Sequence, residues 1–413
     1  MSLDLTKFDA ALKVHYGPQR MATIGYEGRP LYSMLSKYTK FGGRNMPYPV
    51  RFAGPQNLAA GYLEANRANS GDPATSSSTL AEFLVTRKRK YGSVVLDRET
   101  MIASEGDLNA FARATTMEID AGLEGFNDEV HQGLFKSGTG ARAALTGVAG
   151  TTWTVALADI TRFEVGMAVQ VSDTTTATSI LETDIVTILS VDRDAGTMLL
   201  SAAIAGAGVG QHVFRYGDRQ QAAITADSQW LNCPGLPDII PASAPTGGDS
   251  FRGVDRSQDP TRLAGHRIAW AGDYKKTFMK CGVELGRNGA KGDKVCFVNH
   301  TDLSGIMDEY ADKLEHRDNV AVTKFSAGFE AYAIKTPMGT VSIVADHQCP
   351  AGAGWLLTMA DWELVSARAV PHFIDEGGKF LRSHESDSFK VEFVAYYALA
   401  CKNPGRSAYV NFS

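Results

Sequence analysis

Three polar residues near the middle of the chain have types that could support hydrolysis. His300, Asp302 and Ser304 lie within a five-residue stretch. A serine hydrolase needs a serine nucleophile, a histidine base and an acid that orients the histidine. The members of such a triad converge from distant parts of a chain, and a serine in the first turn of a helix is ordinarily a cap. We therefore predict a structural role for these residues and no catalytic residue.

Five carboxylates form a second group on one stretch of chain: Glu118, Asp120, Glu124, Asp128 and Glu129. A carboxylate pair performs acid–base catalysis where a pocket raises the pKa of one member. The sequence indicates no such pocket. These acids are more simply interpreted as a solvated face, or as a face that contacts a neighbouring copy of the chain.

The strongest local charge feature is a basic run, Arg87, Lys88, Arg89 and Lys90. It is interpreted with about equal weight as a solvated strand edge, where lysine discourages aggregation, or as a docking strip for acidic residues of a neighbouring copy. Residues 1–100 hold 14 Lys and Arg against 8 Asp and Glu, whereas the remainder holds 27 against 38. This asymmetry favours an acidic partner of the same kind, and nucleic acid is a weaker candidate.

Motifs for metals and nucleotides are missing from the sequence. There is no HExxH motif, and the glycine-rich residues 206–210 lack the GxGxxG spacing and precede a predicted strand, so they are predicted to form a turn. The five cysteines are widely spaced and include no CxxC pair, which favours five buried thiols over a metal or redox site. We predict no cofactor and no metal.

The bulk composition is that of an ordinary folded protein. The chain has 413 residues, of which 44% are hydrophobic and 21% charged, so two or three domains of about 150 residues are expected. No run approaches the ~20 apolar residues that a membrane span needs. Residues 1–20 lack the apolar core of a signal peptide, and we expect a cytosolic chain.

One element stands out, a long amphipathic helix predicted over residues 104–137. Apolar residues recur there at steps of three and four, and Ser104 with Asp107 resembles a capping box. Gly122, Gly125 and Gly133 would weaken the helix, so packing along its length must hold it.

The segments around this helix are predicted to be mostly extended. Residues 48–54 and 81–98 are expected to form two long strands of a projecting hairpin, joined by a flexible tip at 65–79. After the helix, five short predicted strands indicate a small β-barrel or sandwich: residues 153–157, 167–172, 185–191, 197–202 and 211–215. A second long helix is predicted from Asp259-Pro260 to about Gly286. A long β segment, residues 389–399, follows near the end.

The order of these elements resembles the Hong-Kong-97-type major capsid proteins of tailed phages, over almost the whole chain. Residues 296–302 (CFVNHTD) before a helix are similar to the entry into the axial domain of that family. Residues 163–171 (FEVGMAVQV) with 188–192 (ILSVD) resemble a β-barrel insertion found in some members. The fold that the resemblance implies is α+β, with an N-arm (1–44), an extended loop (45–103), a spine helix in a peripheral domain (104–144), an inserted barrel (145–219), a second peripheral part with a long helix (220–292), an axial domain (293–385) and a return strand (386–413).

The resemblance implies a shell subunit without catalytic activity, which assembles in the host cytoplasm into pentamers and hexamers of an icosahedral virion that encloses DNA without reading its sequence. Scaffolding, portal and decoration proteins are possible partners, and no membrane is expected. Intersubunit contacts are expected from Arg87, Lys88, Arg89 and Lys90 of the loop and from Glu118, Glu124 and Asp128 of the helix. Lys88 or Lys90 also lies in the loop that some members link covalently to an asparagine. The alternatives are a hydrolase-like enzyme without a recognisable motif and an encapsulin-like compartment shell.

Overall fold

The computed structural model describes residues 28–54, 60, 78–97, 108–173, 185–218, 230–290, 292–311, 322–324, 330–374, 381–382 and 387–412. Residues 1–27 of the expected arm, most of the expected hairpin tip and the expected capping box at 104–107 lie outside these ranges.

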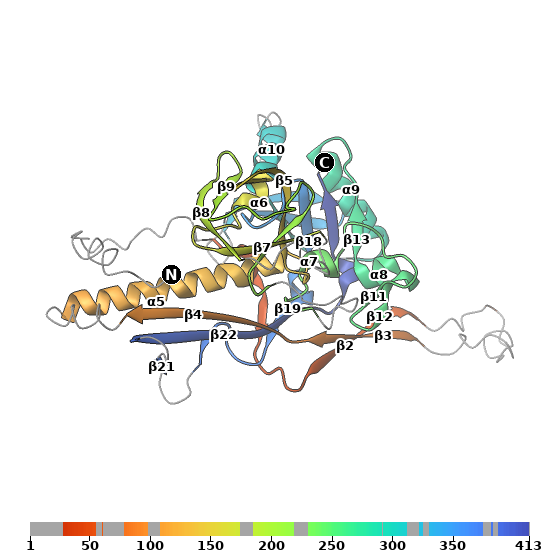
Figure 1. Cartoon of the computed structure of the whole chain (residues 1–413). Helices are drawn as coiled ribbons and strands as arrows, with labels where there is room; N and C mark the ends of the chain where they lie inside the picture. The colour runs from red at the N-terminus through yellow and green to blue at the C-terminus, as the bar shows by residue number, and fades with distance from the viewer. Residues whose placement is uncertain are drawn as a thin grey trace.

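The predicted long helix is confirmed as α5, Leu108–Leu134, although it ends three residues earlier than expected. It lies along a two-stranded ribbon of β4 (Lys88–Asp97) and β22 (Ser388–Cys401), which pair antiparallel over ten positions of β4. Figure 1 shows the helix and the ribbon side by side, reaching away from the body of the molecule.

The ribbon belongs to a six-stranded sheet. Its path is β1 (Ser36–Tyr38), β19 (Trp362–Ser366), β22 and β20 (His372–Phe373), and both β4 and β21 (Leu381–Arg382) also pair with β22. Within the expected N-arm, α2 (Pro30–Met34) buries Leu31, and β1 pairs with β19 in parallel. Residues 30–38 therefore pack on their own subunit.

The expected hairpin is confirmed for its first strand and corrected for its second. β2 (Asn45–Ala53) pairs antiparallel with β3 (Thr79–Thr86), but the chain changes sheets at Arg87, and β4 pairs with β22 instead. The buried positions reveal the reason: odd-numbered residues are buried in β3, whereas Lys88 and Val94 are buried in β4. A strand with period two cannot keep both sets on one face, so two strands form.

Residues 141–215 form a closed six-stranded barrel, in the order β10-β5-β6-β9-β8-β7. The five predicted strands are confirmed as β6 (Thr152–Val155), β7 (Ala168–Ser172), β8 (Val186–Asp192), β9 (Thr197–Leu200) and β10 (His212–Arg215). The sixth, β5 (Ala141–Ala149), was not predicted, because its small residues give no clear alternation. A short helix, α6 (Leu157–Ile160), follows β6. The first and last barrel strands pair, so the chain leaves the barrel close to where it enters.

A seven-stranded mixed sheet forms the rest of the body. Its order is β13 (His266–Ile268), β23 (Ala408–Asn411), β18 (Ala353–Leu357), β14 (Lys294–Val298), β17 (Gly339–Ala345), β16 (Glu330–Thr336) and β15 (Val322–Lys324). Helices α9 (Tyr274–Arg287) and α10 (His300–Ala311) pack on it, with Phe278 and Ile306 in the shared core.

The second long helix was wrongly predicted. Asp259 does cap a helix, but this is the five-residue α8 (Pro260–Ala264), which is followed by strand β13 before α9 begins at a cap of its own, Asp273. Gly265 ends α8 with φ +75°, and a Cβ there would lie 3.0 Å from the carbonyl oxygen of Ser407. The close approach of another backbone segment therefore breaks the helix.

The remaining described elements are short: α7 (Leu236–Ile239), β11 (Ser250–Phe251), β12 (Val254–Asp255), and 3₁₀ turns at Arg256–Gln258, Met359–Asp361 and Pro404–Arg406. All five cysteines are buried free thiols, as predicted. Within the described ranges, no helix is both long and apolar enough to cross a membrane.

Candidate assembly surface

The projecting helix is held to its ribbon by close backbone approach. A Cβ on Gly122 would lie 2.3 Å from Cγ2 of Val94, and a Cβ on Gly92 would lie 2.8 Å from Cδ2 of Phe126. Both distances are below any real carbon–carbon contact, so only glycine permits this packing. Gly122, predicted to weaken the helix, is the residue that lets it lie against the ribbon.

A cluster of buried charges fixes the inner half of the helix to the barrel. Glu129 of α5 accepts two hydrogen bonds of 2.6 Å from Nη2 of Arg142 on β5, and Nη1 of Arg215 on β10 lies 2.7 Å from its Oε1. Lys90 of β4 lies 3.4 Å from Glu129 and donates to Asp218 at 2.7 Å. Three segments far apart in sequence therefore meet at one carboxylate.

The electrostatics of Glu129 follow from these neighbours. Burial by itself would raise the pKa of Glu129, but Arg142, Lys90 and Arg215 outweigh it and hold the pKa well below its usual range. The charged form of Glu129 is thus the one that stabilises the fold. Sequence reasoning did not distinguish Glu129 from the other acids of the helix, since its partners lie 13 to 86 positions away.

The basic run is largely engaged within its own subunit. Lys88 is only 6% exposed and donates from Nζ to the carbonyl oxygen of Trp230 at 2.5 Å, and Lys90 belongs to the charge cluster. Arg87 donates to the carbonyl oxygen of Phe41 at 3.2 Å. Residues 88 and 90 face the helix because alternate residues of a strand face opposite sides.

Arg89 points to the other face of the ribbon and is exposed. There it lies near Tyr396, whose ring meets the exposed Tyr91 edge-to-face at 6.4 Å. Of the four basic residues, Arg89 is thus the one best placed for contact with a neighbour, and that contact stays a prediction. The buried amine of Lys88 and the ion-paired amine of Lys90 also leave a covalent link at either position without structural support.

The three acids expected to contact neighbours do not share one face. Glu124 and Asp128 lie one turn apart, whereas Glu118 lies six residues before Glu124, about 240° around the helix. Nε of Arg29 in the same chain donates a hydrogen bond to Oδ1 of Asp128, and Nη2 of Arg29 donates to the carbonyl oxygen of Glu124 at 3.1 Å. Burial raises the pKa of the half-buried Glu118. Asp128 is therefore engaged internally, and intersubunit contact stays a prediction for Glu118 and Glu124.

The outer face of the hairpin carries exposed apolar residues that sequence reasoning did not single out. Leu80 is 63% exposed and Leu84 is 41% exposed, while the alternate residues of β3 are buried. On the paired strand, Pro47 lies opposite Leu84 and Arg51 opposite Leu80. A period-two pattern with apolar residues on both faces was the signal that could have revealed this surface.

A buried hydrogen-bonding contact joins the helix to the residue that follows β17 of the seven-stranded sheet. Nε2 of His131 lies 2.9 Å from Oδ2 of Asp346, and both side chains are fully buried. The ring of His347 lies 5.8 Å from that of His131, and burial lowers the pKa of His347. The contact between His131 and Asp346 anchors the end of α5, because removing either side chain leaves the other buried polar group without its hydrogen-bond partner.

The residues first considered for hydrolysis have structural roles. The cap of α10 is Asn299, which accepts from the backbone N–H of Thr301 at 3.0 Å, and not Ser304. Asp302 accepts from the backbone N–H of Gly352 at 2.9 Å and thereby tethers a loop. In the described parts of the chain, no group of three or more His, Cys, Asp or Glu side chains could hold a metal ion.

Comparisons with known proteins give likenesses to solved structures. No family model and no curated protein sequence matches the chain. A chain of the cyanophage A-1(L) capsid asymmetric unit is similar with a TM-score of 0.55 and 10% sequence identity, over 97% of this chain and 95% of that chain. The chain has the fold of a phage capsid protein.

Two weaker likenesses involve a chain of Mycobacterium phage Adephagia and one of the holo-SrpI encapsulin complex from Synechococcus elongatus PCC 7942. The first has a TM-score of 0.45 and 10% identity over 100% of this chain and 98% of that chain. The second has a TM-score of 0.46 and 9% identity over 98% and 94%. The likeness to the cyanophage chain extends over almost the whole chain and is not confined to one element.

Proposed function

We propose that this chain is the major shell subunit of a tailed double-stranded-DNA phage, with a Hong-Kong-97-type fold, and that its function is self-assembly. The observation that carries the proposal is the likeness to the cyanophage capsid chain over 97% of the length. The projecting helix and ribbon, with the hairpin on the opposite side of the body, support it because such extensions offer area to neighbours (Figure 1).

In this proposal the elements have definite places in the shell subunit. Residues 45–97 correspond to the extended loop, α5 to the spine helix and β22 to the return strand. The barrel, residues 141–215, is the inserted domain, with its start moved four residues earlier than the sequence suggested. The seven-stranded sheet with α9 and α10 corresponds to the axial domain and part of the peripheral domain.

The contacts between copies are assigned to the surfaces left open by the fold. Leu80 and Leu84 of the hairpin would lose exposed apolar area against a neighbour, which drives association. Arg89 and the acids of α5 would set orientation and partner choice more than affinity.

The place of action follows from this function. The subunits assemble in the host cytoplasm into pentamers and hexamers of a virion shell that encloses DNA without sequence-specific contact. Scaffolding, portal and decoration proteins are its other proposed partners. Assembly needs no catalysis and no cofactor.

The direct test is the mass of the purified chain by light scattering, alone and after co-expression with the other head proteins of its phage. We expect a mass many times the 44.4 kDa of one chain, corresponding to rings or closed shells. A chain that stays monomeric or dimeric in both preparations contradicts the proposal.

A further inference from the structure

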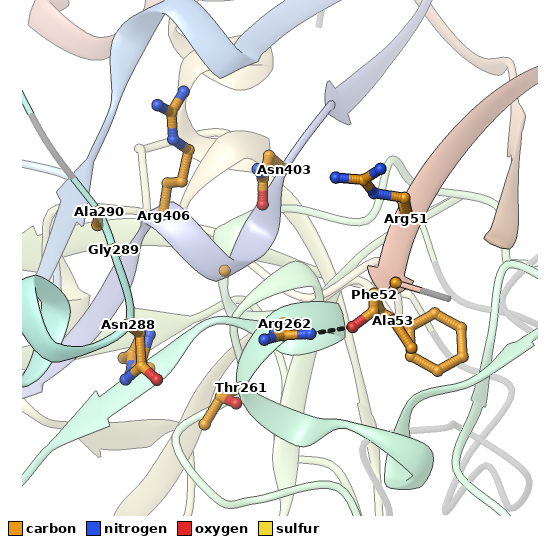
Figure 2. A pocket seen from close by; sticks show the side chains of 13 residues that line it. Arg51, Phe52, Ala53, Thr261, Arg262, Asn288, Gly289, Ala290, Asn403 and Arg406 are labelled. Atoms are coloured by element: carbon orange, nitrogen blue, oxygen red, sulfur yellow. Dashed lines mark hydrogen bonds between the residues drawn. The ribbon is translucent and has the colours of Figure 1, made fainter. Parts of the chain in front are cut away.

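A polar cleft of about 370 Å³ lies where the hairpin leaves the body. It is lined by the end of β2, by α8, by the turn after α9 and by the 3₁₀ turn at Pro404–Arg406 (Figure 2). Its walls include Arg51, Arg262 and Arg406, and none of the lining residues is acidic. The cleft therefore carries excess positive charge.

The three guanidinium groups are only partly neutralised. Arg262 donates to the carbonyl oxygen of Phe52 and lies 3.6 Å from Asp259, while its side chain stays 63% exposed. Arg406 lies 3.5 Å from Asp361 on the rim. Arg51 is exposed and has no ion pair with any described residue. The single contact of Arg406, which is longer than 3 Å, leaves most of the hydrogen-bonding capacity of its guanidinium group unused.

The complementary charge lies in the middle of α5. Asp120 and Glu124 lie one turn apart on the projecting part of α5, so their side chains form one acidic row. Asp120 is exposed and Glu124 half-exposed, and neither carboxylate has an ion pair within the described residues. Figure 1 shows α5 reaching away from the body on the side opposite to α8 and the β2–β3 hairpin.

We propose that the cleft around Arg51 and Arg262 binds the acidic row Asp120–Glu124 of α5 from a second copy of this chain. Arginine forks suit carboxylates, and two complementary patches on different elements of one molecule join copies head to tail. A heterologous contact of this kind closes into a ring when its rotation permits. This proposal rests on the proposed function and gives its rings a specific ionic contact.

The choice of a second copy as occupant rests on charge and on number. The row offers two carboxylates, and two of the three arginines of the cleft, Arg51 and Arg262, are exposed, whereas Arg406 is half-buried. Every ring of copies satisfies all of them at once, because each molecule brings both halves. A free anion such as phosphate would occupy the cleft but leave the acidic row unpaired.

The test is assembly of Arg51→Glu beside the unchanged chain, by electron microscopy and sedimentation across a concentration series. Arg51 has no described ion pair to lose within the subunit, so the variant should fold. We expect it to need at least about tenfold more subunit for half-maximal assembly, since close charge pairs across interfaces contribute ~1.5 kcal/mol or more. Lys275→Glu, on an exposed turn of α9 outside the cleft, is the matched control and should assemble normally.

A charge swap separates this contact from general damage. Asp120→Lys with Glu124→Lys should impair assembly like Arg51→Glu. Combining these changes with Arg51→Glu and Arg262→Glu in one chain should restore at least half of the lost assembly. The inference is overturned if Arg51→Glu assembles like the control, or if the swapped chain assembles no better than the single-sided variants. It is also overturned if millimolar phosphate restores the assembly of the chain that carries Asp120→Lys and Glu124→Lys. Failure of the unchanged chain to assemble would instead overturn the proposed function.

Discussion

Glu129 is the residue on which the position of the long helix depends most. Side-chain nitrogens of Arg142, Arg215 and Lys90 lie 2.6, 2.7 and 3.4 Å from its carboxylate oxygens. The two arginines come from barrel strands and the lysine from the ribbon. Removing one partner of a buried ionic group costs more than the pair contributes, because the remaining charges stay desolvated.

Glu129→Gln should therefore lower the free energy of unfolding by about 3 kcal/mol at pH 7. Urea denaturation of the dissociated subunit measures this. Glu164→Gln is the matched control, since its pair with Arg193 is 46% and 49% exposed, and it should change stability by less than about 1 kcal/mol. Equal effects of the two substitutions would contradict the role assigned to the cluster.

The pH dependence of the same group has a definite sign. The folded-state pKa of Glu129 is depressed, so its contribution is fully present above the unfolded value of about 4.5 and is lost as the pH falls below it. The difference in stability between the unchanged chain and Glu129→Gln should shrink between pH 5 and pH 3. A constant difference over that range would rule out this account.

Lys294 differs from Glu129 because its charged form destabilises the fold. The residue is 1% exposed, and its amine donates to the carbonyl oxygen of Arg406 at 2.7 Å; burial, with Arg406 nearby, lowers its pKa to about 8. Between about pH 8 and 10.5 the unfolded chain holds a proton that the folded chain has released, so stability rises with pH. Relative to Lys294→Met, the unchanged chain should gain on the order of 1–3 kcal/mol over this window in urea denaturation. No relative gain would contradict the burial of a lysine that loses its charge.

At the scale of elements, packing decides where glycine helps. Gly122 faces Val94 with no room for a Cβ, whereas nothing lies within 4 Å of the position that a Cβ on Gly125 would take. Gly122→Ala should therefore cost about 1–3 kcal/mol through overpacking, and Gly125→Ala should add up to ~1 kcal/mol through helix propensity. Thermal denaturation of the two variants checks this. If both substitutions raise the stability, or both lower it, the packing described is contradicted.

Elements with strong local patterns could be predicted from the sequence. The spacing of apolar residues predicted α5, and alternation with turn residues predicted five barrel strands. The break between β3 and β4 was missed, although the phase of alternation changes at Arg87, because the choice of β22 as partner is set 300 residues away. Gly265 ended a helix for the same kind of reason, the approach of the backbone at Ser407. The charge cluster required that fold and could not be predicted before it.

At the scale of the whole molecule, the proposed assembly depends on surfaces that one copy leaves open. The hairpin presents Leu80 and Leu84, the middle of α5 presents Asp120 and Glu124, and the cleft at the base of the hairpin presents Arg51. These surfaces are on extensions rather than on the barrel core or the seven-stranded sheet (Figure 1). A stable interface needs a large buried area, and this molecule can bury such an area only when its extensions overlap neighbouring copies.

Electron cryomicroscopy of the particles formed by the expressed chain, with the other head proteins of its phage if needed, tests the central claim most directly. The account predicts closed icosahedral shells built from rings of five and six copies, in which the hairpin of each copy lies on its neighbour. Particles without such rings, or a chain that remains a monomer or dimer under every assembly condition, would contradict it.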